Sequence, residues 1–254
     1  MLKGLLTGLL LLLFLPFSAI SVTVELTDII DALETPFKGE TKSSEQVKDF
    51  SANFLQESHI ASIDRTQHGQ GTVQFKFIAA AAGHSSQAKF RWEYQKPTVQ
   101  EIISDGQTLW VYLPENHQVI ESDIGKMDSR QGQNPVTFLS GLGNLSEDFL
   151  ISWGAPRSTA AGDYVLELEP RKPSQFIRQI QIIVSQQAVN NWLKKGKTGE
   201  IFPIISTLVT DPNGNITAIK FRDVKVNRNL ADRLFSFKRP AGVEVIDPGE
   251  QLNF

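Results

Sequence analysis

Several side chains able to do chemistry are present in this sequence, but their spacing is not that of a catalytic or metal site. The four histidines are scattered, and no His-Glu-x-x-His motif or other paired ligand spacing occurs. Ser86 and Lys89 have the spacing of a serine–lysine pair, which short segments often match by chance. Glu167 and Glu169 have the residue types of a glycosidase pair, yet they alternate with leucines, which predicts one solvated strand face. We therefore expect no catalysis, no metal and no cofactor.

Composition excludes further classes of protein. The 254 residues include no cysteine, which excludes disulfide scaffolds, thiolate zinc sites, cysteine nucleophiles and a lipid-modified cysteine. Lys plus Arg number 25 against 28 Asp plus Glu, so the net charge of −3 gives nucleic-acid binding no support. Hydrophobic residues make up 41%, enough for a sizeable core. Sixteen phenylalanines against three tyrosines and four tryptophans show a preference for aromatic rings without a polar group.

The N-terminus has the pattern of a secretory signal peptide. Lys3 precedes an unbroken apolar run over residues 9–15, which is followed by Pro16 and by small residues up to Ser21. A membrane anchor is the alternative. A span needs about 20 mainly apolar residues, and this stretch reaches that length only if its Thr, Gly, Pro and Ser residues are counted. We expect residues 1–21 to be cleaved and residues 22–254 to form a single soluble, exported domain without a lipid anchor.

Hydrophobic periodicity predicts a mainly β chain. Apolar and polar residues alternate from Thr72 and again from Phe90 to Tyr94. The Asp105-Gly106 dipeptide predicts a tight hairpin turn. Further strands are predicted at 102–103, 109–113, 119–120, 150–153, 164–168, 176–184 and 201–210. The turn at 211–214 leads from the last of these into 216–226, which predicts another strand pair. One mostly antiparallel sheet with a few helices is the simplest fold for this pattern.

Helical spacing is found at fewer places. Apolar residues recur at three- and four-residue intervals over 26–33, which predicts an amphipathic helix ended by Pro36. Residues 47–54 fit two patterns: Val47, Phe50 and Phe54 have helical spacing, whereas Phe50, Ala52 and Phe54 alternate as in a strand. We expect a helix that is followed by a strand within this stretch. Pro135 suits the first turn of a short apolar helix that runs to Leu142. An inserted helix or loop is expected at 186–199, and loops at 79–86 and 125–134.

A large antiparallel sheet has one apolar face that must be covered. If the sheet curls into an open barrel, that face becomes concave, the helices are the available cover, and a wide barrel leaves room for a ligand. Phenylalanine suits this face because it has no polar tip that needs a partner. The alternative is a dry core, which apolar stripes usually form. The residues concerned are Phe50, Phe54, Phe75, Phe90 and Phe138.

Two neighbouring segments have a distinctive sequence: Lys89–Pro97, KFRWEYQKP, and Ile103–Tyr112, ISDGQTLWVY. Together they resemble the central signature of the LolA family, the periplasmic carriers of outer-membrane lipoproteins. Further similarity follows in order at Asn134-Pro135, at Phe138-Leu139 and over residues 235–245. The resemblance covers most of the chain from about Val47 onward.

This resemblance implies an α+β, mainly β fold: an unclosed antiparallel β-barrel, or half-barrel, with an α-helical lid over a hydrophobic cavity. It also implies a carrier that binds the acyl chains of lipoproteins released from the inner membrane and delivers them to the outer membrane. The implied partners are triacylated lipoproteins, an inner-membrane ATP-driven lipoprotein exporter and an outer-membrane lipoprotein receptor. We expect a monomer in the periplasm. The receptor of such a system is itself a lipoprotein, so the absent cysteine places this chain on the carrier side.

The resemblance also indicates which residues serve as the site. Phe90 aligns with a cavity-rim phenylalanine that the family uses to receive and hand on cargo. Trp92 aligns with the signature tryptophan, for which simple packing is the alternative role. Ser86-Gln87 stands where the family has an Arg-Pro pair whose arginine helps to hold the lid closed, and Arg91 or Lys89 is a candidate substitute. The expected acyl-chain cavity and lid comprise Phe50, Phe54, Phe75, Phe90, Trp92, Val136, Phe138, Leu139 and Leu142.

Three other functions remain open at this point. Related open barrels carry other envelope lipids, such as glycolipids or phospholipids, and some sense misplaced lipoproteins and regulate a partner. A secreted hydrolase is the third alternative. Because one fold hosts several functions, the fold likeness alone does not identify the cargo.

Overall fold

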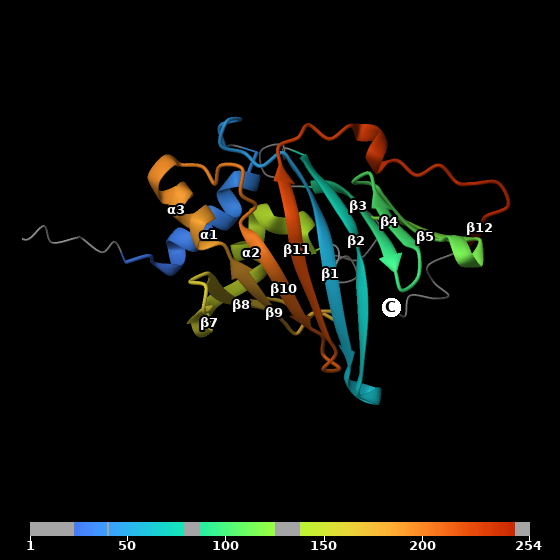
Figure 1. Ribbon diagram of the computed structural model, residues 1–254, viewed down its shortest axis with the longest axis horizontal. Helices are drawn as coiled ribbons and strands as arrows, with labels where there is room; N and C mark the ends of the chain where they lie inside the picture. The colour runs from blue at the N-terminus through green and yellow to red at the C-terminus, as the bar shows by residue number, and fades with distance from the viewer. Residues whose placement is uncertain (1–22, 40, 79–86, 125–137, 247–254) are drawn as a thin grey trace, which may run out of the picture.

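The computed structural model of the chain describes residues 23–39, 41–78, 87–124 and 138–246 (Figure 1). The expected signal peptide at 1–21, the expected loops at 79–86 and 125–134, and Val136 lie outside the described residues. The division of the chain at residue 21 therefore stays a prediction. In the described part, no helix is both long and apolar enough to cross a bilayer.

Twelve strands form one sheet. Their bounds are β1 (Asp49–Ile60), β2 (Arg65–Ile78), β3 (Gln87–Lys96), β4 (Gln100–Ser104), β5 (Thr108–Leu113), β6 (Gln118–Asp123), β7 (Phe149–Ser158), β8 (Tyr164–Pro170), β9 (Gln179–Val184), β10 (Ile204–Thr210), β11 (Ile216–Val226) and β12 (Glu244–Ile246). The helices are α1 (Leu26–Glu34), α2 (Leu145–Asp148) and α3 (Gln186–Lys195), with 3-10 segments η1 (Thr35–Phe37), η2 (Ala61–Ile63), η3 (Pro114–Asn116), η4 (Phe138–Asn144) and η5 (Asp232–Phe235).

The strand order is β12-β6-β5-β4-β3-β2-β1-β11-β10-β9-β8-β7. Neighbouring strands are antiparallel except for β12, which runs parallel to β6. Within the described residues the end strands β7 and β12 do not pair with each other, so the sheet is unclosed. The fold class expected from the sequence is therefore confirmed, and every predicted strand is present, several with shifted ends.

The stretch 47–54 contains no helix, so the expected hand-over from helix to strand is wrong. Val47 lies in a connector and donates its N–H to the carbonyl of Pro36 at 2.9 Å. Strand β1 begins two residues later and pairs with β2 on one side and β11 on the other. These long-range pairings satisfy the backbone on both sides and therefore override the helical spacing of three apolar residues.

Residues 216–226 form β11, which pairs with β10 across the turn at 211–214, as expected. The pairing of β11 with β1 shifts by one position near Asp223, whose φ is 53°. One further prediction needed correction. The expected helix ending at Leu142 is the 3-10 segment η4, followed by one turn of α2. Gly141 and Gly143 lie inside η4, and glycine disfavours a regular α-helix.

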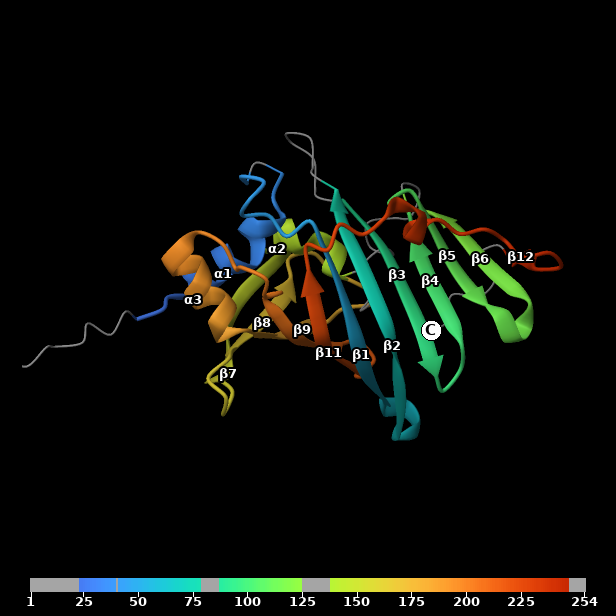
Figure 2. The same ribbon diagram turned by 45° about the horizontal axis from the view of Figure 1, so that its top comes forward.

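The helices cover one face of the sheet. α1 packs against α3 and η4, and η4 packs against β3. Figure 2 shows α1, α2 and α3 gathered together beside β7–β11. The alternation along each strand points Phe50, Ala52 and Phe54 of β1 to this covered face, where all three are buried. The core of the protein is therefore the layer between the sheet and its helices.

The segment after β11 crosses the opposite face of the sheet and ends as β12 at the far edge (Figure 1). Asp232 pairs with Lys89 at 3.0 Å and with Lys76 at 3.2 Å. Phe235 of η5 is buried, and the ring of Phe237 lies 5.4 Å from that of Tyr112. Strand β12 was not predicted from the sequence, because it has only three residues and no alternating pattern of its own.

The ion pairs of Asp232 predict a pH-dependent attachment of this segment. Hydrogen bonds from Lys89 and Lys76 lower the pKa of the Asp232 carboxyl. The stabilisation is therefore fully present above the unfolded pKa of about 4 and is lost as the pH falls through the lower folded pKa. We expect amide exchange of residues 232–246, normalised to intrinsic rates, to accelerate at that lower pH in the wild-type protein.

The matched variants are Asp232→Asn and Asp31→Asn, the second at an exposed site on α1. Asp232→Asn should exchange faster in this segment already at pH 7, without the acid-dependent step. If Asp232→Asn and Asp31→Asn give the same exchange profile, the ion pairs do not hold the segment.

Candidate functional site

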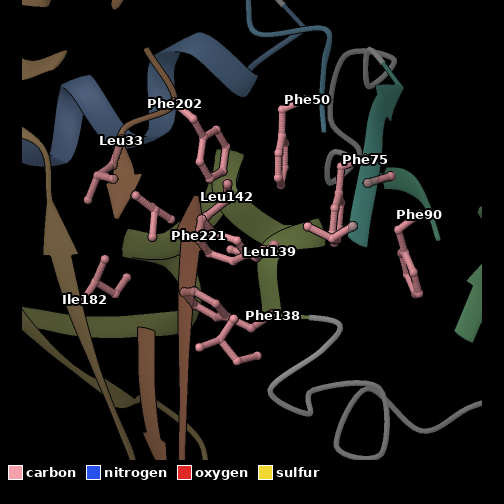
Figure 3. Packing of buried hydrophobic residues seen from close by; sticks show 14 of the residues in the cluster. Leu33, Phe50, Phe75, Phe90, Phe138, Leu139, Leu142, Ile182, Phe202 and Phe221 are labelled. Carbon is pink, nitrogen blue, oxygen red and sulfur yellow. The ribbon is translucent and has the colours of Figure 1, made fainter. Parts of the chain in front are cut away.

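The candidate site is the apolar layer between the sheet and the helices (Figure 3). Phe50, Phe75 and Phe90 occupy paired positions on β1, β2 and β3, so their rings form a row across three neighbouring strands. The rings of Phe50 and Phe75 stack at 5.2 Å, and those of Phe75 and Phe90 at 5.4 Å. This row forms a continuous aromatic floor that lies perpendicular to the strands.

A second group of aromatic side chains lies further along two of these strands, β1 and β3. The rings of Phe54 and Trp92 meet edge to face at 4.9 Å, and the ring of Tyr94 lies 4.9 Å from that of Phe54. The Tyr94 hydroxyl donates a hydrogen bond to the side-chain oxygen of Gln56 at 2.7 Å. Burial raises the pKa of Tyr94, so this hydroxyl stays protonated and ends the apolar floor with a satisfied polar group.

Apolar residues of the covering segments close the layer from the other side. Phe202, just before β10, stacks on Phe50 at 4.0 Å. Leu139 and Leu142 of η4 point among the rings, and Leu33 of α1 approaches from the helix side (Figure 3). Phe138 of η4 packs edge to face on Phe149 of β7 at 5.9 Å.

The structure brings the predicted site residues together. Eight of the nine belong to one buried cluster, in which each exposes 5% of its surface or less; Val136 lies outside the described residues. The interior is thus closed by its own side chains in this conformation. Phe90, expected at the rim, is only 2% exposed, although it stands at the end of the aromatic row.

The larger open groove lies on the opposite face of the sheet. Its volume is about 880 Å³, and it is lined by outward-facing residues of β1, β11, β10 and β9, among them Leu55, Lys220, Leu208 and Ile183. Access to the aromatic layer therefore does not run through this groove.

The polar groups that suggested chemistry lie away from this layer. Leu166 and Leu168 are fully buried on β8, whereas Glu167 and Glu169 face outward, as predicted from their alternation. In the described part of the chain, no three His, Asp or Glu side chains lie close enough together to hold a metal ion.

The sequence of this chain is similar to that of a known protein family. The sequence profile described as "Outer membrane lipoprotein carrier protein LolA" matches residues 45–238, about three quarters of the chain. The chain belongs to the LolA family. Its match spans β1 to η5 and therefore includes the whole aromatic floor and the covering segments η4, α2 and α3.

Individual relatives agree with this membership. An outer-membrane lipoprotein carrier protein of Nitrosospira multiformis is 26% identical over 189 residues, which cover 72% of this chain and 77% of the relative. A protein of the same name from Cupriavidus taiwanensis is 31% identical over 186 residues, with the same coverage. The crystal structure of a LolA superfamily protein from Nitrosomonas europaea is 15% identical, with a TM-score of 0.39 over 85% of this chain and 99% of that chain.

The sequence suggested Arg91 or Lys89 as a substitute for a lid-holding arginine, and the structure directs neither toward the cover. Ser86 lies outside the described residues. Lys89 pairs with Asp232, and Arg91 pairs with Glu93 and Glu101 on the face of the sheet opposite the helices. Side chains at alternate positions of a strand point to opposite faces, so both residues point away from the lid while Phe90 and Trp92 point toward it.

A buried carboxylate instead joins two covering segments. Glu34, the last residue of α1, is 3% exposed. One of its carboxylate oxygens accepts a hydrogen bond from the backbone N–H of Ser146 in α2, and the other pairs with Lys38 at 3.0 Å. A buried carboxylate is costly unless it is both paired and hydrogen-bonded, and Glu34 is both. Hence α1 and α2 are held to each other by a charge-assisted contact.

Sequence reasoning missed three contributors to this site. Phe202 and Phe221 lay within predicted strands, but their contact with Phe50 depends on how distant strands meet. Glu34 follows the apolar stripe of α1, where an acidic residue normally indicates a solvated position. Only the tertiary packing of α1 against η4 buries it.

Removing the Glu34 carboxylate is expected to loosen the cover. Glu34→Ala leaves the Ser146 N–H without its acceptor, which costs about 1–3 kcal/mol for a buried donor. Hydrogen exchange by mass spectrometry should show faster exchange in α1 and η4 but not in the central strands β1–β3. Glu34→Gln, which retains an acceptor for Ser146, should lie between Glu34→Ala and the wild type.

Asp31→Ala is the matched control because Asp31 is an exposed carboxylate on the same helix. It should leave the exchange of α1 and η4 unchanged. Equal acceleration in Asp31→Ala and Glu34→Ala would show that the carboxylate of Glu34 has no special role.

Proposed function

We propose that this protein is a periplasmic carrier that shields the acyl chains of lipoproteins between its sheet and its helices. Membership of the LolA family supports the class of function, and the apolar layer supports the mechanism. The observation that carries the proposal is the continuous aromatic floor built by Phe50, Phe75 and Phe90 under a cover of short helical segments. No step of this function is catalytic.

The physical need for such a carrier follows from the chemistry of the cargo. Each methylene group that leaves an apolar environment for water costs about 0.8 kcal/mol, so a triacylated protein does not cross an aqueous space unaided. The floor and the cover offer aliphatic and aromatic carbon over the whole cluster. Acyl chains would replace the contacts that the cover makes with the floor, so that little apolar surface meets water at any stage.

The cover is built to separate from the sheet. α1 has nine residues, η4 seven and α2 four, all shorter than a helix that is stable alone in water. η4 is a 3-10 helix, whose hydrogen bonds have poorer geometry than those of an α-helix. These segments are therefore held mainly by packing on the floor. An acyl chain would compete with them by making apolar contacts of the same kind.

The route of the cargo determines the proposed partners. A carrier of this kind receives its lipoprotein from an inner-membrane ATP-driven exporter and passes it to an outer-membrane lipoprotein receptor. Apolar contact without strong polar anchors suits both exchanges, because the cargo must leave as readily as it enters. We propose that the protein acts as a monomer, with one covered layer per chain.

A direct test uses the purified protein and a triacylated lipopeptide. Isothermal titration calorimetry should show binding with a negative heat-capacity change, the mark of buried apolar surface, and the same peptide without acyl chains should not bind. Depletion of the protein in its native host should leave lipoproteins in the inner membrane. Co-purification of free phospholipid or glycolipid alone, with no lipopeptide binding, would instead indicate a carrier of another envelope lipid.

Phe90→Glu places a charge in the aromatic row and is expected to abolish lipopeptide binding. Because Phe90 is buried, the variant should also lose about 3 kcal/mol of unfolding free energy, measured by urea denaturation. Phe90→Leu keeps an apolar side chain and should retain binding within about threefold. Full binding by Phe90→Glu under conditions where it is folded would remove Phe90 from the proposed site.

A further inference from the structure

A buried hydrogen-bond donor of the apolar layer has no partner among the described residues. The indole N–H of Trp92 is buried, and no acceptor for it lies within reach among the described residues. The whole side chain is 0% exposed. Buried tryptophan N–H groups usually find a partner, so an unsatisfied one at the centre of a candidate binding layer requires an explanation.

The surroundings of Trp92 explain why no acceptor is near. Its ring contacts Phe54 edge to face at 4.9 Å and lies 6.1 Å from the ring of Phe75. Its partners in the neighbouring strands are Val73 on β2 and Ile102 on β4, both buried and apolar. The donor therefore lies within hydrocarbon, where an unsatisfied polar group destabilises the closed conformation.

The covering segment opposite β3 repeats the feature. Ser140 of η4 has a buried hydroxyl with no hydrogen-bond partner in the described part of the chain. η4 packs directly against β3, the strand that carries Trp92. Two unsatisfied polar groups thus come from the two elements that would have to part when a ligand enters. A ligand that satisfied them would favour the open, loaded conformation over the closed one.

The chemistry of an acyl chain limits what that ligand group is. The hydrocarbon tail has no hydrogen-bond acceptor, and the first acceptor along the chain is the carbonyl oxygen that joins it to the rest of the molecule. We propose that the indole N–H of Trp92 donates a hydrogen bond to an ester carbonyl oxygen of the bound acyl group. This inference rests on the proposed carrier function and makes Trp92 a specificity-determining residue within it.

The proposal predicts discrimination between esters and ethers. An ether keeps the chain length and shape but lacks the carbonyl oxygen. The probes are an S-diacylglyceryl lipopeptide with two ester-linked chains and its dialkyl analogue with two ether-linked chains. We expect the wild-type protein to bind the ester about tenfold more tightly, the effect of one hydrogen bond to a donor that is otherwise unsatisfied.

Trp92→Phe removes the donor and keeps an aromatic ring. It should bring the ratio of the affinities for ester and ether from about ten to about one, whatever change in overall affinity the smaller ring causes for both probes. Trp110→Phe is the matched control, since Trp110 lies on the opposite face of the sheet near the ring of Phe237. That variant should retain the full preference for the ester.

A measurement on the wild-type protein keeps the test decisive if Trp92→Phe does not fold. The chain has four tryptophans, so a ¹⁵N-labelled sample gives four indole N–H signals. The Trp92 signal should move downfield when the ester lipopeptide is added and should not do so with the ether. Downfield displacement with both probes, or with neither, would overturn the proposal.

The outcomes separate this inference from the proposed function. Binding of neither probe would contradict the carrier function itself. Equal binding of ester and ether by the wild-type protein would leave the carrier function intact and overturn the role of Trp92. In that case the indole N–H would be satisfied by a contact with the neighbouring face of an aromatic ring, a weak interaction that needs no ligand.

Discussion

The structure depends on one constraint: a wide sheet that does not close on itself has an apolar face that must be kept from water. Over the ranges that the structure describes, the end strands β7 and β12 do not pair with each other, so the sheet does not bury this face by completing a barrel. The face is instead covered by α1, η4, α2 and α3, which are short segments. Hydrophobic contact therefore holds the two layers together, and this contact is non-directional and replaceable. A cover attached in this way keeps the fold intact while its contacts with the sheet remain exchangeable.

One face of the sheet is apolar and the other is polar, and side chains of the two kinds alternate along the strands. On β3, Phe90 and Trp92 enter the apolar layer, whereas Lys89 and Arg91 point to the other side. There Lys89 pairs with Asp232 of the C-terminal segment, and Arg91 donates a hydrogen bond to the carbonyl of Leu234 at 3.4 Å. That segment ends by pairing with β6 at the edge of the sheet. The polar contacts of these strands thus lie on one face and their apolar contacts on the other.

Much of this arrangement could be predicted from the sequence, because a two-residue period encodes both the strand and the face. The floor residues from Phe50 to Trp92 were identified in this way, and the resemblance to the LolA family supplied the curled sheet and the lid. Prediction failed where local pattern and long-range pairing disagree, as at 47–54, or where an element is too short to show a period, as at β12. Glu34 could not be identified as a buried carboxylate, since its environment is formed by two segments more than 100 residues apart in the chain.

A carrier's closed conformation must not be too stable, and the composition of the interior reflects this limit. An interior in which every polar group was satisfied and every void filled would hold its cover too firmly for any acyl chain to displace. The aromatic floor is held by apolar contacts, and in the proposed function an acyl chain would make contacts of the same kind. The unsatisfied donor of Trp92 and the hydroxyl of Ser140 weaken the closed side of that balance. The polar link between Glu34 and Ser146 joins the covering segments to each other and not to the floor, so they can move as one unit without breaking it.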